Sequence, residues 1–392
     1  MCAARRALVK ILVVFGTRPE AIKLAPLVAE LRRRPGIDVT VALTAQHRQL
    51  LDQVLDVFDI RPAVDLALMR PMQTLAELSS RVLTAVDELI TRFTPDLVIV
   101  QGDTTSALIS AMAAFYRGVP VAHVEAGLRT SSLFSPFPEE MNRRGISLVA
   151  MLHFAPTDRG RQSLLSEGVA PDAAFVTGNT VVDALQRLQG SDRYRLVPVP
   201  VPAGDNERLI LVTIHRRESW SVLPRVAEAI RSIVEQRPQV RVVIPVHPNP
   251  IVQDAFAAIE SHPRVSLIAP LDYFGFIKQM QASEFVMSDS GGVQEEAPVL
   301  GRPVLVLRDT TERPEAVEQG VARLVGTEPQ AIVAAALTLL DDAAQFQAMS
   351  RAVSPFGDGK ASHRIADLLQ AHEKAIQEYA RRPGNPRAFA RA

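Results

Sequence analysis

Short runs of Val, Ile and Leu alternate with longer amphipathic stretches along the chain. Runs that are apolar at nearly every position are typical of parallel strands buried on both faces, and the stretches between them have helical spacing. The predicted strands are 11–15, 39–44, 97–101, 119–124, 153–156, 174–177, 209–214, 240–246, 265–268, 284–287 and 304–307. The predicted helices include 21–33, 50–58, 75–93, 106–117 and 362–379. Thr74 and Glu77 have the spacing of a capping box at the start of one of them.

A loop near the midpoint divides this alternation in two. Pro198, Pro200 and Pro202 alternate within 196–206, and a central strand cannot hold them. The strand–helix rhythm restarts after this loop, so we predict an α/β fold of two Rossmann-like, doubly wound domains. The expected domains are 1–178 and 179–365, with a helix at about 366–380 that packs back on the first domain and a mobile tail at 381–392. Such domains place ligands at the carboxyl ends of their strands, which predicts an active site in the cleft between them.

Composition excludes several classes of protein. The 392 residues contain 43 basic and 43 acidic side chains, a formal net charge of zero, whereas a nucleic-acid-binding domain is usually strongly basic. Cys2 is the only cysteine, which rules out an intramolecular disulfide and a Cys-based metal site and fits a reducing cytoplasm. We see no apolar run of the roughly 18 residues needed to span a membrane, and the short run 11–15 after Arg5 and Arg6 imitates a signal peptide only faintly.

Acidic side chains follow the predicted strands of the first half. Asp103 follows strand 97–101, Glu125 follows strand 119–124, and Glu139 precedes Glu140 at a predicted helix start. Any one of them is equally well explained as a helix cap or a partner of the helix dipole. Together they place carboxylates at one edge of a sheet, where mutual repulsion can raise a pKa into the range of a general acid or base.

The second half supplies cations and a glycine turn at the corresponding positions. His215, Arg216 and Arg217 follow one predicted strand, and His247 follows the next. In the sequence 288–296, Gly291 and Gly292 open a helix after a strand, so backbone amides can approach a diphosphate. In the first half, the loop 16–20 offers Arg18 at a helix start in the same way, although a capping turn explains it too.

Three motifs are missing from the sequence. The dinucleotide fingerprint G-x-G-x-x-G, the P-loop and the serine-hydrolase elbow G-x-S-x-G do not occur, and no His or Cys spacing suggests zinc. We therefore expect no cofactor and no metal.

Seven segments, in order and nearly without gaps, resemble the non-hydrolysing UDP-N-acetylglucosamine 2-epimerases, which share the two-domain glycosyltransferase-B-type fold. They are 15–20, 101–104, 123–129, 136–143, 215–218, 288–296 and 308–316. The resemblance implies C2 epimerisation of UDP-N-acetylglucosamine to UDP-N-acetylmannosamine, in which elimination of UDP gives a 2-acetamidoglucal and UDP then adds back. It also implies a role in cell-surface polysaccharide synthesis and a homodimer.

The resemblance also implies residue roles. Asp103, Glu125 and Glu139 are the carboxylates at the two faces of the sugar, and His215 assists at the sugar–diphosphate. The remaining implied ligands are Arg18 and Lys23 for the diphosphate, Ser290, Gly291 and Gly292 for phosphate, Glu296 for the ribose, Phe276 for uracil, and Arg313 in support.

The chain departs from the family at two places. His215-Arg216-Arg217-Glu218 continues with Ser219-Trp220-Ser221, where the family often has Asn and then Gly. Some bacterial members bind a second substrate molecule as an activator, and Met72 stands where such a site has Arg. The residues here that fit that site are Gln46, Gln49, Arg216 and His247.

Four other functions remain open on the sequence. They are a hydrolysing epimerase that releases N-acetylmannosamine, an epimerase of a modified UDP-amino sugar, a glycosyltransferase of the same architecture, and a nucleotide-sugar-binding protein without turnover. The three carboxylates argue against the last.

Overall fold

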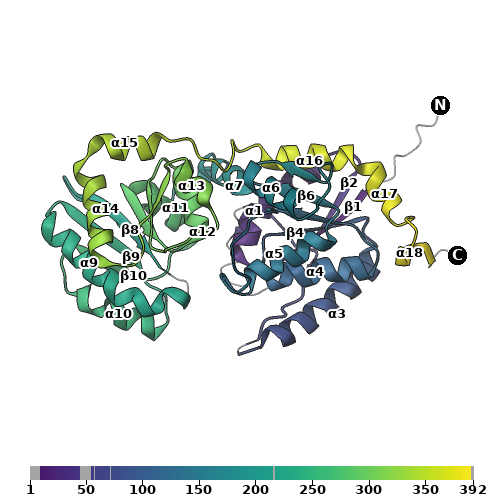
Figure 1. The fold of residues 1–392 in the computed structure, drawn as a ribbon, viewed down its shortest axis with the longest axis horizontal. Coiled ribbons are helices and arrows are strands. Elements are labelled where there is room, and N and C mark those ends of the chain that lie inside the picture. Colours follow the sequence, from purple (N-terminus) through teal and green to yellow (C-terminus); the bar gives the residue numbers. More distant parts are fainter. Residues whose placement is uncertain (1–8, 45–53, 57, 71, 215–216, 390–392) are drawn as a thin grey trace. The chain divides into compact units, whose positions relative to one another are not determined.

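The computed structural model describes residues 9–44, 54–56, 58–70, 72–214 and 217–389. By its internal packing the chain divides into two compact units, 1–187 with 356–392 and 188–355. The first is called unit 1 and the second unit 2, and each is built around one parallel sheet (Figure 1).

The sheet of unit 1 has seven strands in the order β3-β2-β1-β4-β5-β6-β7. Each neighbouring pair is parallel, so every connection must cross a face of the sheet. A helix makes each crossing except that between β2 and β3, where part of the connection lies outside the described residues. The strands are β1 Val9–Phe15, β2 Ile37–Leu43, β3 Val64–Asp65, β4 Leu97–Gln101, β5 Val121–Val124, β6 Leu152–Ala155 and β7 Ala174–Val176. The helices are α1 Arg18–Arg33, α3 Leu75–Phe93, α4 Thr105–Tyr116, α5 Glu139–Val149, α6 Asp158–Ser166, α7 Thr180–Gln189, α16 Ala361–Ala371, α17 Glu373–Tyr379 and α18 Pro386–Phe389.

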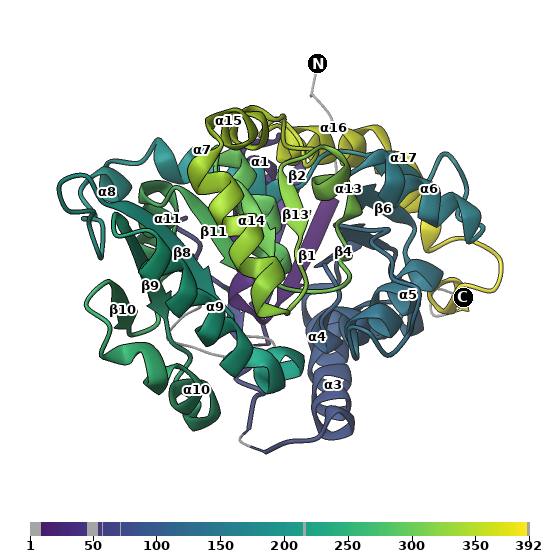
Figure 2. The same ribbon diagram turned by 60° about the vertical axis from the view of Figure 1, so that its left-hand side comes forward.

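Unit 2 repeats this topology with six strands in the order β10-β9-β8-β11-β12-β13. The strands are β8 Arg208–Thr213, β9 Val240–Pro245, β10 Val265–Ile268, β11 Phe285–Ser288, β12 Val304–Val306 and β13 Ala322–Leu324. The helices are α8 Asp192–Arg195, the 3-10 helix η1 Arg217–Val222, α9 Leu223–Gln236, α10 Pro250–Glu260, α11 Tyr273–Ala282, α12 Gly291–Val299, α13 Pro314–Glu318, α14 Pro329–Asp341 and α15 Ala343–Arg351. Helices α9 and α14 lie side by side against the sheet (Figure 2).

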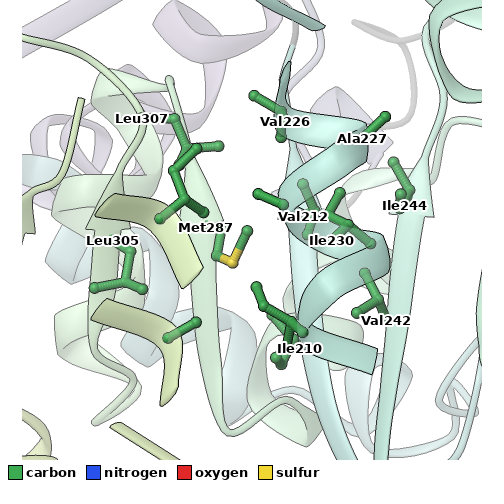
Figure 3. Packing of buried hydrophobic residues seen from close by; sticks show 14 of the residues in the cluster. Ile210, Val212, Val226, Ala227, Ile230, Val242, Ile244, Met287, Leu305 and Leu307 are labelled. Carbon is green, nitrogen blue, oxygen red and sulfur yellow. The ribbon is translucent and has the colours of Figure 1, made fainter. Parts of the chain in front are cut away.

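Aliphatic side chains of the sheet and of the helices packed on it form the core of unit 2. Ile210 and Val212 of β8, Ile230 of α9 and Leu305 of β12 are all fully buried (Figure 3). Burying one such side chain contributes about 1.5–3 kcal/mol, and β-branched residues pack well on a pleated sheet. The apolar runs that predicted the strands therefore also supply the core.

The predicted strands are present with shifts of one or two residues, and the capping box of Thr74 and Glu77 starts α3. Strands β3 and β13 were not predicted, because β3 has only two residues and β13 has Arg323 at its centre, so neither shows an apolar run. The predicted helix 362–379 is broken at His372 into α16 and α17. Most of the predicted helix 50–58 lies outside the described residues.

The carboxyl-terminal segment belongs to unit 1. Helix α16 packs on α1, and Arg34 at the end of α1 bonds Asp367 at 2.7 Å. The packing division falls within α7. In the described part of the predicted tail, Asn385 and Arg387 form hydrogen bonds with unit 1. Their side chains donate to the backbone oxygens of Gly118 and Pro95, at 3.2 and 3.1 Å, so the tail satisfies backbone groups at the edge of the unit.

No helix among the described residues is long and apolar enough to cross a membrane.

Two histidines are buried side by side in the sheet of unit 1. His123 of β5 is the register partner of His153 of β6, and their exposed fractions are 0% and 1%. Burial lowers the pKa of His123 to about 3 and that of His153 to about 4, and the nearby Arg129 opposes protonation of both rings. Both are therefore neutral in the folded chain at neutral pH.

These histidines predict acid sensitivity. Their pKa in the unfolded chain is near 6.5, so each takes up a proton on unfolding between that value and its folded pKa. The stabilisation is present above pH 6.5 and is lost as the pH falls toward 4 and then 3. The free energy of unfolding should fall by about 1.4 kcal/mol per pH unit for each histidine within its window. Urea unfolding at several pH values should show a smaller slope for His153→Phe, with the exposed His363→Phe as control. Equal slopes in wild type and His153→Phe would contradict the assignment.

Candidate functional site

Three loops of unit 1 meet at the carboxyl edge of its sheet. Strand β1 pairs with β2 on one side and with β4 on the other, so the strand order reverses there. Ligands of doubly wound sheets bind at such a switch point. The loops after β1, β4 and β5 carry Arg18, Asp103 and Glu125, three of the predicted site residues.

The loop after β1 ends in a helix start. Thr17 caps α1, and Glu20 completes a capping box by accepting the Thr17 amide at 2.7 Å. Arg18 is the first residue of α1, and Pro19 follows it, where a missing N–H costs nothing. Arg18 is half-buried, at the positive end of the helix dipole, where an anion is favoured.

Asp103 is held by an arginine from α5. Arg143 donates to Oδ2 of Asp103 from Nη2 at 2.5 Å and from Nε at 3.2 Å, while Asn142 donates to the Asp103 carbonyl oxygen at 2.8 Å. The Asp103 side chain keeps 27% of its surface exposed. A carboxylate that is oriented by a buried cation and still reaches solvent can act on a bound ligand.

Glu125 occupies a strained and crowded position. Its φ is 64°, in the left-handed region that non-glycine residues rarely adopt, and it is 9% exposed. Lys23 of α1 forms an ion pair with its Oε2, and Gln101 and Asn179 donate to the same oxygen at 2.8 and 3.4 Å. Strain of this kind persists where surrounding contacts over-determine the conformation, and it clusters at functional sites.

Glu139 and Glu140 have different environments. Glu139 is the first residue of α5 and half-buried. Glu140 is fully buried and accepts from Arg143 at 2.9 Å, from Arg144 at 2.7 Å and from the amide of Thr130 at 3.0 Å. Glu140 therefore holds Arg143 and the start of α5 in place. Glu139 is the carboxylate of this pair that reaches the surface of the unit.

In unit 2 the corresponding edge carries the glycine turn. Strand β11 pairs with β8 at the reversal of strand order, and α12 begins just after it. Ser288 donates its hydroxyl to the Thr213 carbonyl at 3.0 Å and accepts the Ser290 amide at 3.0 Å. These bonds join the turn to β8 and fix Ser290 as the N-cap of α12. The first amides of a helix are the donors that a phosphate needs.

Arg313 lies directly beneath this turn. It donates to Glu295 at 2.6 Å and pairs with Glu312 at 2.9 Å, and it is buried. A Cβ on Gly291 would lie 2.3 Å from Nη1 of Arg313, whereas a Cβ on Gly292 would meet nothing closer than Oγ of Ser290 at 3.8 Å. A methyl group on Gly291 would therefore have to displace the paired guanidinium of Arg313.

Helix α11 lies beside α12. Tyr273 donates its hydroxyl to Oε1 of Glu296 at 3.2 Å, and Glu296 is 8% exposed. Phe276, one turn further along α11, is half-buried. An anchored carboxylate and an aromatic ring on adjacent helices suit a nucleoside, since one can accept from a ribose diol and the other can stack on a base.

The structure does not describe every predicted site residue. Gln46, Gln49, His215 and Arg216 lie outside the described residues. His247 follows β9 and is exposed, with its ring 6.2 Å from that of Trp220. Met72 is fully exposed.

The structure adds four residues that sequence reasoning missed as site residues: Glu20, Gln101, Arg143 and Asn179. Gln101 is the last residue of β4, and Asn179 follows β7, so a strand-end position was the available signal for both. Within the described residues, no cluster of three His, Cys, Asp or Glu side chains could hold a metal ion.

Comparisons with known proteins show which family this chain resembles. The family model described as UDP-N-acetylglucosamine 2-epimerase matches residues 29–370. A Bacillus subtilis protein named UDP-N-acetylglucosamine 2-epimerase is 50% identical over 365 residues, 93% of this chain and 95% of that protein. An Escherichia coli (strain K12) protein of the same name is 48% identical over 369 residues, 92% of this chain and 98% of that protein. A crystal structure of the Neisseria meningitidis UDP-GlcNAc 2-epimerase bound to UDP-GlcNAc aligns with a TM-score of 0.87 at 43% identity, covering 92% of this chain and 100% of that one. The predicted glycosyltransferase-B-type fold class is confirmed.

The two glycines provide a matched test of the packing beneath the turn. Gly291→Ala should destabilise unit 2 by about 1–3 kcal/mol, because the new methyl group displaces a buried, doubly paired guanidinium. Gly292→Ala should change stability by less than about 1 kcal/mol, since its methyl group enters open space at a helix start. Thermal unfolding of both variants measures the difference, and equal losses would contradict the packing role of Gly291.

Proposed function

This chain belongs to the UDP-N-acetylglucosamine 2-epimerase family, and from that premise we propose that it interconverts UDP-N-acetylglucosamine and UDP-N-acetylmannosamine without hydrolysis. The observation that carries the proposal is the placement of Asp103 and Glu125, each at the carboxyl end of a central strand and each held by a cation. Glu139 begins the helix that supplies the cation for Asp103.

The chemistry explains why more than one carboxylate is required. The proton on C2 of an acetamido sugar is not acidic, so inversion proceeds by elimination. A base removes this proton, its electron pair forms the C1–C2 double bond, and the C1–O bond breaks toward UDP, which leaves 2-acetamidoglucal. UDP then adds back to C1 while C2 is protonated on the opposite face. Groups that take and give protons are therefore needed on both faces.

The environments of the carboxylates suit these roles. Arg143 forms an ion pair with Asp103 and Lys23 forms one with Glu125, so each carboxylate is held in one orientation toward a bound sugar. Lys23, implied as a diphosphate partner, donates to Glu125. Arg18 at the start of α1 remains the diphosphate partner proposed for unit 1.

Unit 2 is proposed to retain UDP between the two half-reactions. The amides of Gly291 and Gly292 at the start of α12 receive the diphosphate, Glu296 the ribose and Phe276 the uracil. Arg313 supports the turn from beneath through Glu295 and Glu312. His215 is proposed to act at the sugar–diphosphate.

A deuterium experiment separates this function from its alternatives. We expect the protein in D2O to place deuterium at C2 of both UDP-sugar epimers, which NMR detects. Asp103→Asn should slow this exchange by at least about 100-fold and leave UDP affinity nearly unchanged. The exposed Asp158→Asn, at the start of α6 after β6, is the matched control.

Three outcomes would contradict the proposed reaction, and a fourth would contradict the role of Asp103. Accumulation of free N-acetylmannosamine indicates the hydrolysing enzyme, and exchange with only a modified UDP-amino sugar indicates a different substrate. Absence of both exchange and product indicates a transferase or a binding protein. Loss of UDP affinity in Asp103→Asn would move Asp103 into the phosphate site.

The proposal extends to a cytoplasmic role in making activated N-acetylmannosamine for cell-surface polysaccharide, with a lone cysteine in keeping with that compartment. It also includes activation by a second substrate molecule near His247.

A homodimer is part of the proposal as well. Helices α4 and α5 pack together, and large apolar side chains are exposed on both: Phe115, Tyr116, Met141 and Leu148, the last 87% exposed. A second copy would remove them from water. Light scattering after size exclusion should give a dimer for wild type and a monomer for Leu148→Glu. The control is Leu196→Glu in unit 2, where Leu196 is 85% exposed. A monomeric wild type, or a dimeric Leu148→Glu, would contradict this interface.

A further inference from the structure

Glu20 joins two loops of the unit 1 site. Its Oε2 accepts the amides of Gly16 at 3.1 Å and Thr17 at 2.7 Å, in the loop after β1. Its Oε1 accepts the hydroxyl of Thr104 at 2.8 Å, in the loop after β4. The two strands are neighbours in the sheet, so one side chain links the loop of Arg18 to that of Asp103.

The direction of each hydrogen bond is fixed by its surroundings. Thr104 is the N-cap of α4, and its hydroxyl oxygen accepts the amide of Ala107 at 3.0 Å. Its single proton is therefore directed at Glu20, and Glu20 receives three donors on two oxygens. Burial raises the pKa of Glu20, while the hydrogen bonds from Thr17, Thr104 and Gly16 lower it.

A second capping box shows what capping alone requires. Thr74 and Glu77 form the same motif at the start of α3, where Glu77 accepts from the amide and the hydroxyl of Thr74, at 2.7 and 3.1 Å, and is exposed. Glu20 is 1% exposed. Burying a carboxylate costs free energy unless hydrogen bonds replace those it made to water. The exposed Glu77 shows that a capping box does not require this burial. What distinguishes Glu20 from Glu77 is the bond to another loop.

We propose that Glu20 is a positioning residue that holds the loop of Asp103 in register with the loop of Arg18 through the hydroxyl of Thr104. The catalytic consequence rests on the proposed epimerase function. Thr104 is adjacent to Asp103, so release of this bond lets the carboxylate move away from C2. Misplacement of a catalytic group by about 1 Å can reduce the rate about 100-fold.

Two disruptive variants and two conservative ones test the proposal. Thr104→Val and Glu20→Ala remove the bond between the loops, and each should lower kcat by about 10–100-fold while KM changes by less than about threefold. Thr104→Ser keeps the hydroxyl. Glu20→Gln keeps an acceptor for the two amides and can donate to Thr104. Both should stay within about threefold of wild type. Thr74→Val and Glu77→Ala, which break the same capping box on α3, should leave kcat unchanged.

A double variant asks whether the two residues act as one unit. The double variant Glu20→Ala with Thr104→Val should have the kcat of the worse single variant, because each substitution already removes the hydrogen bond that joins the two loops. Multiplying losses would overturn the proposal, as would a wild-type kcat in Thr104→Val. A Glu20→Gln variant as impaired as Glu20→Ala would also overturn it. The rate would then depend on the charge of Glu20 and not on its hydrogen bond to the loop of Asp103.

Hydrogen exchange tests the link independently of the reaction. Glu20→Ala should speed amide exchange at 102–107 as well as at 16–17, although it contacts the former only through Thr104. Unchanged exchange at 102–107 would overturn the proposal. If the wild type fails to epimerise while this coupled exchange is seen, the proposed function fails and the link between the loops stands.

Discussion

The ion pair of Lys23 and Glu125 is the interaction on which the rest of the unit 1 site depends. A buried carboxylate at a strand end, with a left-handed backbone, is stable only when its charge is compensated and its lone pairs accept hydrogen bonds. Three side chains donate to this carboxylate: Lys23 from α1, Gln101 from β4 and Asn179 from the segment after β7. One carboxylate therefore connects three segments of the chain. Two of them, α1 and β4, adjoin the loops that carry Arg18 and Asp103.

The two units divide the chemistry although they share a topology. In unit 1 the switch point carries Asp103, held by an arginine, and Glu125, held by a lysine, which suits proton transfer. In unit 2 the same position has a glycine turn over a buried arginine, which suits an anion. The formal net charge of zero thus combines two local environments with opposite requirements.

The sequence predicted much of the fold because long apolar runs and caps are local signals. Strand β4 and helix α3 begin and end where they were predicted, while β3, with two residues, and β13, with Arg323 at its centre, show no apolar run. Site residues at strand ends could also be found. The pairing of Lys23 with Glu125 could not, since the two are 102 positions apart and only the fold brings them together. For the same reason the bond between Glu20 and Thr104 was hidden behind a capping motif that explained Glu20 locally.

The central claim is that the C1–O bond breaks while UDP stays bound, and positional isotope exchange tests it most directly. Substrate labelled with ¹⁸O in the bridging position between C1 and the β-phosphorus is incubated with the protein, and the label is followed by ³¹P NMR. If UDP is released from C1 and added back, the label should move into the non-bridging positions of the β-phosphate as epimerisation proceeds. Epimerisation with the label still wholly in the bridging position would contradict the account.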